Sequence, residues 1–482
     1  MSGFFTLGEI KERPGVYKRY ENQGTENAGA SEKIAACVVA SNWGPINTPI
    51  RVDNTSNLSA IIGTGTGADV LSEIFYDGPE EAIVVRVGGG GSSGANDGAC
   101  AYTALKAIID DAEVDALLLT TLYPTDRHFT VTVRPALDDE TVTEVTLYEG
   151  TMILESRSFS AENEIAAIVE AFSNSKYIKV VSTLPDESDS GKLSVVTQKA
   201  LTGGANPTVS TAGTSSSYAK GFEALETEVF HYLCVDTNDT NTHAIMTAFI
   251  DRIYNDGAYG RCVIAEPASV ELETRISHAQ AFNNEKVIYV LNSWVGTNGT
   301  TYEGYLAAAR LCGMLAKTPS NESLTHAAIR GAAELAEPLT NSQIKRALRS
   351  GCLVISVSKN RQVIIEKAIN TLVSPATNQD TGWKKIKRVD VRFELMDRIE
   401  KVTDPMIGKV NNDTNGRAAV IAAAQRIIDA MIGEGKLLGG NCLLDTSQQP
   451  VGDSAWFRIA VDDIDALETI YLTFGFRFSQ SS

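Results

Sequence analysis

The stretch that decides the fold runs from Val229 to Glu266 and reads "VFHYLCVDTNDTNTHAIMTAFIDRIYNDGAYGRCVIAE". It starts with an apolar run, continues with a helical pattern over Asn241–Asp256, and returns to an apolar run at Arg261–Glu266. Strands that are apolar throughout and alternate with helices are typical of a parallel sheet covered on both faces. The segment therefore predicts a β-α-β unit.

The same alternation extends in both directions from this unit. Further strands are predicted at Lys33–Ser41, Glu81–Val87, Lys286–Asn292 and Cys352–Ser358. Further helices are predicted at Gly67–Gly78, Val270–Phe282, Glu303–Lys317 and Asn341–Arg349. Thr300 and Glu303 match the S/T-x-x-E pattern, which predicts a capping box at the start of the third of these helices. Together these segments predict a discontinuous α/β core domain over residues 31–98 and 218–365.

Residues 99–205 have a different pattern, in which short alternating runs predict a mainly-β domain. His128–Pro135 and Thr141–Gly150 flank a turn cluster and predict a hairpin, followed by a helix at Ala161–Phe172. Stretches rich in glycine, serine and threonine, Gly88–Gly98 and Thr202–Ser217, bound the region. They are typical of flexible connections, and residues 206–217 are interpreted as a linker. The region is predicted to be a β-sandwich-like domain inserted into the core domain.

Residues 366–482 predict an α+β C-terminal domain. Asn415–Lys436 has one apolar stripe and is predicted to be a helix, with Asn415 as N-cap and Gly435 just after its end. Trp456–Phe476 alternates twice and predicts two strands. The second strand continues to the end, with one wholly apolar face formed by Ile470, Leu472, Phe474, Phe476 and Phe478. The exposed edge of such a strand needs a partner, either within the domain or in another molecule.

Residues 1–30 contain little that could form a core and predict an extended arm. Pro14 disfavours a helix, and the run Gly15–Tyr20 has a short strand-like pattern. The N-terminal residues lack the basic start and apolar segment of a signal peptide, and the sequence has no apolar run long enough to span a membrane. These features predict synthesis and folding in the cytoplasm, without direct membrane insertion.

Charge and cysteine content exclude further classes of protein. The 482 residues carry a net charge of −18, which argues against a general nucleic-acid binder because phosphate backbones need cationic surfaces. The seven cysteines lie far apart and form no CxxC pair, so they are predicted to be reduced and mostly buried. The sequence thus predicts an acidic globular protein with 43% apolar residues and several domains.

Candidates for catalysis, cofactors or metals are weak. "GGGGSSG" lacks the GK[ST] of a phosphate-binding loop and is better explained as a linker. The acidic pairs Asp110–Asp111, Asp138–Asp139 and Asp462–Asp463 are expected at solvated turns or element ends. The five histidines, at positions 128, 231, 243, 278 and 326, show no metal-ligand spacing. The sequence therefore favours a structural or binding protein that holds no cofactor or metal and has no catalytic residues.

Several segments resemble the contractile tail sheath proteins of phages and phage-tail-like bacteriocins. "RPGVY" (Arg13–Tyr17) is similar to the family's N-terminal arm, and "VVASNWGPINTPIRV" (Val38–Val52) is similar to its first strand and loop. Further similarity lies in Phe75–Gly88, Ile369–Ile399, Ile407–Leu437 and the closing stretch Asp465–Phe476. The resemblance covers about three quarters of the chain, and the inserted region matches only loosely.

The resemblance implies a non-enzymatic building block. Hexameric rings of the chain would stack helically around an inner tube, and contraction would drive the tube through a target envelope. It also implies a core domain with a subtilisin-like but non-catalytic fold, and association with the tube, baseplate and tail terminator proteins. Such a protein would assemble in the bacterial cytoplasm and then belong to a virion tail or a released particle.

The resemblance further implies that both ends of the chain exchange strands with neighbouring subunits. The residues concerned are Gly15, Val16, Tyr17, Lys18, Arg19, Tyr20, Ile470, Tyr471, Leu472, Phe474, Phe476 and Phe478. It also places the C-terminal domain next to the tube, where five cations close together form a predicted tube-facing patch: Lys384, Lys385, Lys387, Arg388 and Arg392. An α/β enzyme, or an adhesin-like binding protein that uses residues 99–205, remains the alternative.

Overall fold

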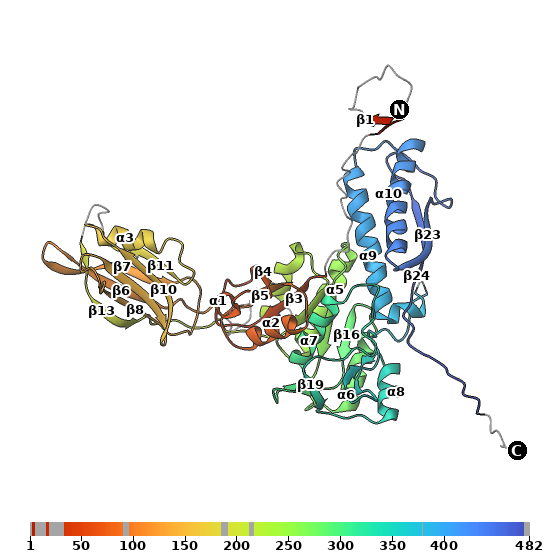
Figure 1. Ribbon diagram of the computed structural model, residues 1–482, viewed down its shortest axis with the longest axis horizontal. Helices are drawn as coiled ribbons and strands as arrows, with labels where there is room; N and C mark the ends of the chain where they lie inside the picture. The colour runs from red at the N-terminus through yellow and green to blue at the C-terminus, as the bar shows by residue number, and fades with distance from the viewer. Residues whose placement is uncertain are drawn as a thin grey trace.

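A computed structural model describes residues 33–89, 96–184, 191–211, 216–377 and 379–476, together with two short N-terminal strands. These strands, β1 (Ser2–Phe4) and β2 (Val16–Lys18), pair in parallel. The described chain forms a central α/β domain, a β domain extending from one side and a helical C-terminal unit on the other (Figure 1). The mixed α/β, multidomain architecture predicted from the sequence is confirmed.

The core domain is built on a seven-stranded sheet. In spatial order its strands are β20 (Cys352–Leu353), β16 (Val287–Val290), β15 (Arg261–Ala265), β14 (Tyr232–Val235), β3 (Ala35–Val39), β5 (Glu81–Arg86) and β4 (Pro49–Asp53). All neighbours are parallel except β4, which runs antiparallel to β5. The five strands from β16 to β5 are buried along nearly their whole length, as the apolar runs predict.

Helices cover both faces of this sheet. One face packs against α2 (Thr66–Tyr76) and α7 (Tyr305–Lys317). The other packs against α4 (Ser217–Ala224), α5 (Thr240–Asn255), α6 (Leu272–Phe282) and α8 (Asn341–Arg349). Small elements complete the domain: α1 (Leu58–Ile61), β17 (Trp294–Gly296), β18 (Thr301–Tyr302), β19 (Ala332–Leu335), β21 (Ile355–Val357), β22 (Val363–Ile365) and the 3-10 turn Leu225–Thr227.

Two predicted helix caps are wrong. Thr300 and Glu303 form no capping box, because α7 begins after Gly304 and Glu303 instead accepts a hydrogen bond from the Ala268 amide. A capping box does occur at Thr340, at the start of α8. In the C-terminal unit the N-cap is Asp413 rather than Asn415, and its carboxylate accepts a hydrogen bond from the Gly416 amide.

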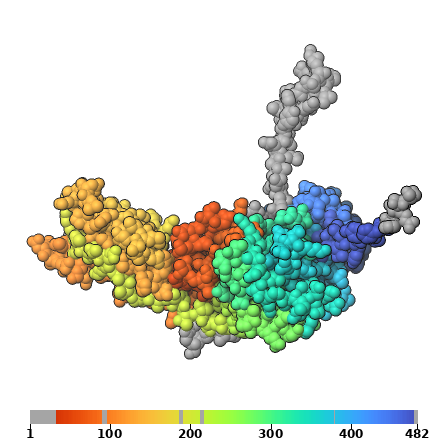
Figure 2. Space-filling model, turned by 60° about the horizontal axis from the view of Figure 1, so that its bottom comes forward, coloured from red at the N-terminus to blue at the C-terminus, as the bar shows by residue number. Residues whose placement is uncertain are grey.

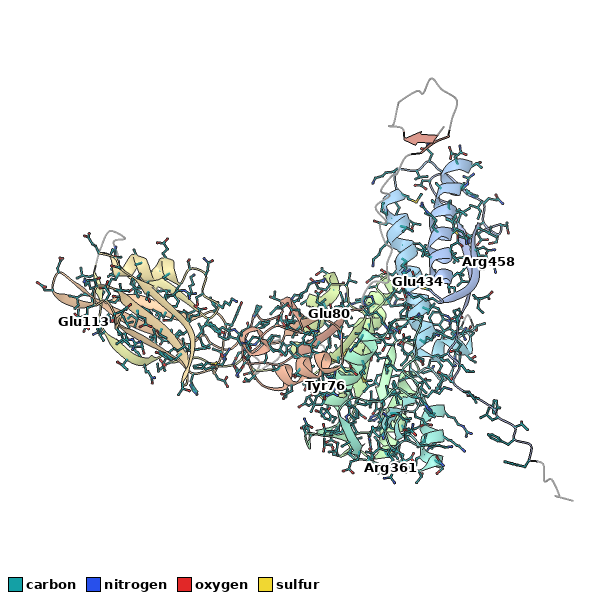
Figure 3. All side chains as sticks on the ribbon, in the orientation of Figure 1. Tyr76, Glu80, Glu113, Arg361, Glu434 and Arg458 are labelled. Carbon is teal, nitrogen blue, oxygen red and sulfur yellow. The ribbon has the colours of Figure 1, made fainter. Side chains whose placement is uncertain are left out.

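The inserted domain is a sandwich of two four-stranded sheets. One contains β10 (Met152–Phe159), β9 (Thr143–Glu149), β8 (Phe129–Pro135) and β13 (Val196–Ala200). The other contains β11 (Ile178–Ser182), β7 (Ala112–Thr121), β6 (Tyr102–Ile109) and β12 (Lys192–Leu193), and α3 (Glu164–Ala171) packs beside it. The domain projects from the core, and Glu113 lies at its far tip (Figures 2 and 3).

The connections between core and insert contain backbone hydrogen bonds that their glycine-rich composition does not predict. Ala99 and Ala205 exchange backbone hydrogen bonds, as do Tyr102 and Thr202, so the incoming and outgoing segments form a paired ribbon. A glycine-rich segment is expected to be flexible only where its backbone N–H and C=O groups lack hydrogen-bond partners. Backbone pairing thus occurs within the predicted linkers, and their flexibility stays a prediction.

Side chains from the core reinforce the junction. Trp43 is 1% exposed and packs edge-on against Tyr123 and Phe129 of the insert. The buried Arg86 guanidinium donates to the carbonyls of Ser41, Gly44 and, across the junction, Pro124. These contacts link the two domains through side chains as well as backbone.

The C-terminal unit packs two long helices against a hairpin. It contains α9 (Ile386–Thr403) between the 3-10 turns Thr381–Lys384 and Asp404–Met406, then α10 (Thr414–Gly433), β23 (Leu437–Leu444) and β24 (Phe457–Asp463). Glu434, which follows α10, receives two hydrogen bonds from the Arg398 guanidinium of α9, and Arg458 lies on the hairpin (Figure 3). The predicted strand after β24 is absent from the described residues 464–476, because no neighbouring strand pairs with them here.

Candidate assembly interface

The segment after β24 carries large apolar side chains in solvent. Their exposed fractions run from 69% at Ile470 to 95% at Phe476, with Tyr471, Leu472 and Phe474 in between. The segment leads away from the body of the molecule (Figure 1). Burying an apolar side chain of this size contributes about 1.5–3 kcal/mol, and the isolated chain does not realise this gain. Phe478, Gly15, Arg19 and Tyr20, which belong to the predicted exchange strands, lie outside the described residues.

The hairpin formed by β23 and β24 offers a place for such a segment. The two strands pair only with each other among the described residues. The Gln425 side chain of α10 bonds to Gly440 and Cys442 of β23, so the open edge is that of β24. Beside β24 lies a hollow of about 410 Å³. Its mostly apolar lining includes Ile399, Ile407, Val410, Val420, Phe457 and Ile459. A strand added at this edge would lay one face over the hollow.

Carboxylates at the root of the exposed segment hold it to the body. Asp463 receives two hydrogen bonds from the Arg388 guanidinium, at 3.0 and 2.6 Å, and one from Arg392 at 2.9 Å. Lys385 lies 2.7 Å from Asp465 and 3.1 Å from Glu468. Asp463 is thus a bound element end rather than the solvated one that the sequence predicts.

The ion pairs shift the acidity of these groups. Burial disfavours the charged form of Asp463, but the bonds from Arg388 and Arg392 outweigh it and lower its pKa. Burial also opposes the charge of Lys385, and here its hydrogen bonds to Asp465 and Glu468 prevail and raise its pKa. Both groups are therefore held in their charged forms.

The five cations of the predicted tube-facing patch lie at the start of α9 or just before it. Lys384 donates to the Leu348 carbonyl, and Lys387 is 7% exposed. Lys385, Arg388 and Arg392 are ion-paired with carboxylates of the same chain, including Asp380. Their charge is thus largely balanced internally, and contact with a tube stays a prediction.

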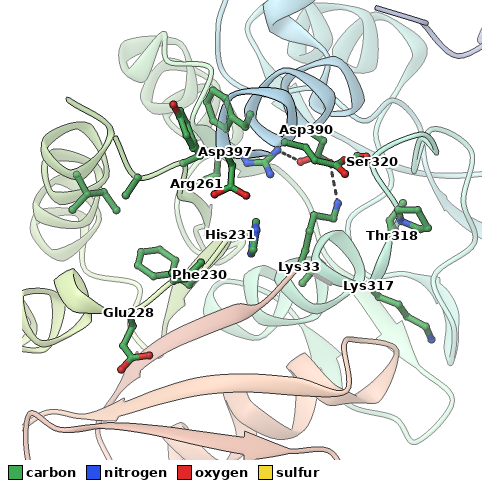
Figure 4. Close-up of a pocket in the computed structure, with 18 of the residues that line it drawn as sticks. Lys33, Glu228, Phe230, His231, Arg261, Lys317, Thr318, Ser320, Asp390 and Asp397 are labelled. Carbon is green, nitrogen blue, oxygen red and sulfur yellow. Dashed lines mark hydrogen bonds and ion pairs between the residues drawn. The ribbon is translucent and has the colours of Figure 1, made fainter. Parts of the chain in front are cut away.

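A second charged cluster joins α9 to the core sheet. Asp390 receives hydrogen bonds from Lys33 at 3.0 Å and from the Tyr232 hydroxyl at 2.8 Å, and forms an ion pair with Arg261. The Asp390 and Arg261 side chains are 4% and 2% exposed. They line a cavity of about 400 Å³ that also contains His231 (Figure 4). The cluster fixes the C-terminal unit on the core.

His231 makes the core sensitive to acid. Its Nδ1 accepts a hydrogen bond from the Ile34 amide, and burial together with the positive charges of Arg261 and Lys33 lowers its pKa to about 4. In the unfolded chain a histidine binds a proton near pH 6.5. The unfolded state thus binds more protons as pH falls from about 6.5 towards 4, and stability falls with pH.

We expect the free energy of unfolding to drop by about 1.6 kcal/mol between pH 6.5 and pH 5 because of His231, with a slope that approaches about 1.4 kcal/mol per pH unit below pH 6. Urea unfolding at several pH values measures this dependence. The variant His231→Asn offers an amide oxygen to the Ile34 amide and should show a flatter profile over this range. An equally steep profile in the variant would contradict this assignment.

The remaining candidate residues show no catalytic arrangement in the part of the chain that is described. His278 lies 2.9 Å from Glu266, which also accepts from the Tyr289 hydroxyl, and His243 contacts the Thr237 carbonyl. Within the described ranges no group of three or more histidine, cysteine or acidic side chains is placed to hold a metal. None of the described helices is both long and apolar enough to cross a bilayer. All seven cysteines are free thiols, and six are buried.

Comparison with known families gives the decisive observation. Residues 212–371 match the family model described as the central domain of phage tail sheath proteins. This segment is similar to the phage tail sheath central domain. The resemblance to contractile tail sheath proteins that the sequence indicates is thereby confirmed. The matched sheath domain spans α4 to β22 and the loop after it, which is the second part of the core domain.

Similarity to known proteins extends well beyond this sheath domain. The phage-like element PBSX protein XkdK of Bacillus subtilis (strain 168) is 23% identical over 401 residues, which cover 81% of this chain and 79% of that protein. The crystal structure of a sheath tail protein from Desulfitobacterium hafniense aligns with a TM-score of 0.65 at 18% identity, over 93% of this chain and 100% of that one. The helical sheath of the anti-feeding prophage, in its contracted state, aligns with a TM-score of 0.53 at 10% identity, over 97% and 99%.

Proposed function

We propose that this chain is the structural subunit of a contractile tail sheath. Copies stack as hexameric rings around an inner tube, and contraction of the sheath drives the tube through a target envelope. The chain acts without catalysis, and its core domain is a non-catalytic, subtilisin-like α/β fold. The sheath central domain and the fold shared with a contracted helical sheath support this proposal.

The observation that carries the proposal is an exposed apolar segment that follows a two-stranded sheet with an unpaired edge. Ile470, Leu472, Phe474 and Phe476 alternate along an exposed stretch, and among the described residues no strand pairs with the outer edge of β24. The segment and the hairpin edge both lack backbone hydrogen-bond partners and contacts for their apolar side chains. Pairing the two would supply both. An extended segment can add a strand to an exposed sheet edge, where main-chain hydrogen bonds give affinity and alternate side chains give specificity.

The proposed exchange pairs residues 470–476 of one copy with β24 of another. Both stretches contain seven residues, which span about 23 Å at ~3.3 Å per residue. The alternating face would cover the hollow lined by Phe457 and Ile459. The N-terminal strand β2 is the second exchanged element in the proposal, and it joins a different neighbour.

The C-terminal unit forms the tube-facing layer in this proposal, and the baseplate and tail terminator bind the ends of the sheath. Because Lys385, Arg388 and Arg392 are already paired and Lys387 is buried, docking on an acidic tube relies on Lys384 and on the charge that the ion pairs leave unbalanced. Such contacts weaken with salt, since the screening length falls to about 3 Å at 1 M. Finished particles are virion tails or released tail-like particles that assemble in the bacterial cytoplasm.

Electron microscopy of the purified full-length protein tests the proposal. We expect rings or helical tubes whose amount rises with protein concentration, and more of them when the cognate tube protein is present. Co-sedimentation with the tube at increasing salt measures the charge-dependent part of docking. A protein that stays monomeric at all concentrations and with the tube would contradict a sheath role.

A further inference from the structure

Three carboxylates at the root of the exposed segment are bound by side chains from two separate parts of the chain. We call this set the tail clamp. It comprises the carboxylates Asp463, Asp465 and Glu468 and their partners Thr325, Lys367, Lys385, Arg388 and Arg392. Arg388 and Arg392 belong to α9 and Lys385 immediately precedes it, whereas Thr325 and Lys367 belong to the region between α7 and α9.

The clamp holds its carboxylates from several sides. The Arg388 guanidinium binds Asp463 through two nitrogens, a fork geometry that fixes direction as well as distance. Glu468 accepts from the Thr325 hydroxyl at 3.0 Å while Lys385 lies 3.1 Å away. The side chains of Asp463 and Glu468 are only 9% and 10% exposed, so solvent screens these pairs less than ordinary surface pairs.

The clamp ends where the exposed stretch begins. Ile464 still donates a backbone hydrogen bond to Lys436, and Glu468 is the last residue with a bond to the body among those described. Every residue from Thr469 to Phe476 is exposed. The direction in which this stretch leaves the body is therefore determined by the bonds of the preceding six residues.

We propose that the tail clamp is a positioning site, which sets the exit direction of residues 469–476 and so preorganises them to bind a second copy of the chain. This inference rests on the proposed function, since it concerns how the exchanged segment reaches its acceptor. A segment held in its bound direction loses less conformational freedom on binding than a free one, which strengthens association without any new contact. Lys385, Arg388 and Arg392 thus bind and position the C-terminal segment of their own chain.

Two sets of neutral substitutions test the clamp in the full-length protein. Lys385→Met keeps the length of the side chain and removes its charge, and Asp465→Asn with Glu468→Gln removes the charges of its partners. We expect either set to raise the concentration needed for tube formation by about tenfold, equivalent to about 1.4 kcal/mol. The combined variant should be little worse than the carboxylate set alone, because that set already breaks both ion pairs of Lys385.

A nitroxide label on Leu467→Cys reports directly on the clamp. Leu467 is 82% exposed, so the label should not disturb packing, and Cys100→Ser removes the cysteine that is not buried. The label should be immobile in the otherwise unchanged protein and mobile in the Lys385→Met variant. Lys401→Met is the matched control, since Lys401 pairs with Asp397 on the same helix at a more exposed position.

The outcomes separate this inference from the proposed function. A mobile label with an unchanged assembly concentration would overturn the positioning role while leaving strand exchange intact. A label that stays immobile without the Lys385 charge would show that the clamp does not hold the segment, and would also overturn it. Normal tubes from a chain without residues 469–482 would instead refute the proposed exchange.

Discussion

A chain that lacks Thr469–Ser482 should remain folded and soluble but form no tubes. The described part of this segment, up to Phe476, is exposed at every residue, so its removal takes no buried side chain from the four hydrophobic clusters of the monomer. In an assembly the same residues would supply a strand and an apolar face. Circular dichroism and thermal unfolding check the fold, and electron microscopy with sedimentation checks assembly.

A pair of point substitutions makes the same test without shortening the chain. Phe474→Lys combined with Phe476→Lys should also prevent tube formation, because an unpaired ammonium is costly to bury. Leu137→Lys is the control, since Leu137 is 90% exposed on the insert and far from the hairpin. If the truncated chain or the double variant polymerised like the unchanged protein, exchange through this segment would be wrong.

Asp390→Ala should lower the free energy of unfolding by about 3–5 kcal/mol, the usual cost of removing one partner from a buried ion pair. The substitution leaves Lys33 and Arg261 buried without their shared carboxylate, and the Tyr232 hydroxyl without its acceptor. Urea or thermal unfolding monitored by circular dichroism measures the loss. Asp397→Ala is the control, because Asp397 is on the same helix with a side chain that is 29% exposed.

The dependence on pH adds a check on Asp390. Burial alone would raise its pKa, but the charges of Arg261 and Lys33 prevail and lower it. A carboxyl group whose pKa is lower in the folded chain contributes stability above its unfolded pKa of about 3.9, and this contribution is lost as pH falls further. The difference between the unchanged protein and the variant should therefore shrink below about pH 4. A loss smaller than 1 kcal/mol at pH 7 would show that the cluster does not hold the two units together.

The core domain could be predicted closely from the sequence because its elements carry local signals. Strands such as Arg261–Ala265 are apolar throughout, and α8 was expected at the residues where it occurs, Asn341–Arg349. Helix starts were less predictable. Thr300 and Glu303 fit the capping pattern, yet the chain continues through β18 and Gly304 before α7 begins. A tertiary contact, the bond from Ala268 to Glu303, overrides the local preference there.

The candidate interface was predictable only in part. The alternation at Ile470–Phe476 indicated a strand whose partner is not nearby in sequence, and the structure leaves this segment unpaired. The clamp could not be predicted, because Lys385 and Glu468 are 83 positions apart and nothing local links them. Counting charges over Lys384–Arg392 therefore indicated a free basic patch, although Asp463, Asp465 and Glu468 come from elsewhere to occupy it.

The junction at Trp43 and Arg86 connects the core domain to the β domain that projects from it. Among the described residues of the junction, the backbone of Ala99 pairs with that of Ala205, and Trp43 packs into the hydrophobic cluster of the sandwich. In the proposed contraction, a rotation of the core domain would carry the far tip near Glu113 through a wider arc than the core itself (Figure 3). If subunits turn in this way, the length of the β domain would set how wide a circle each of them needs.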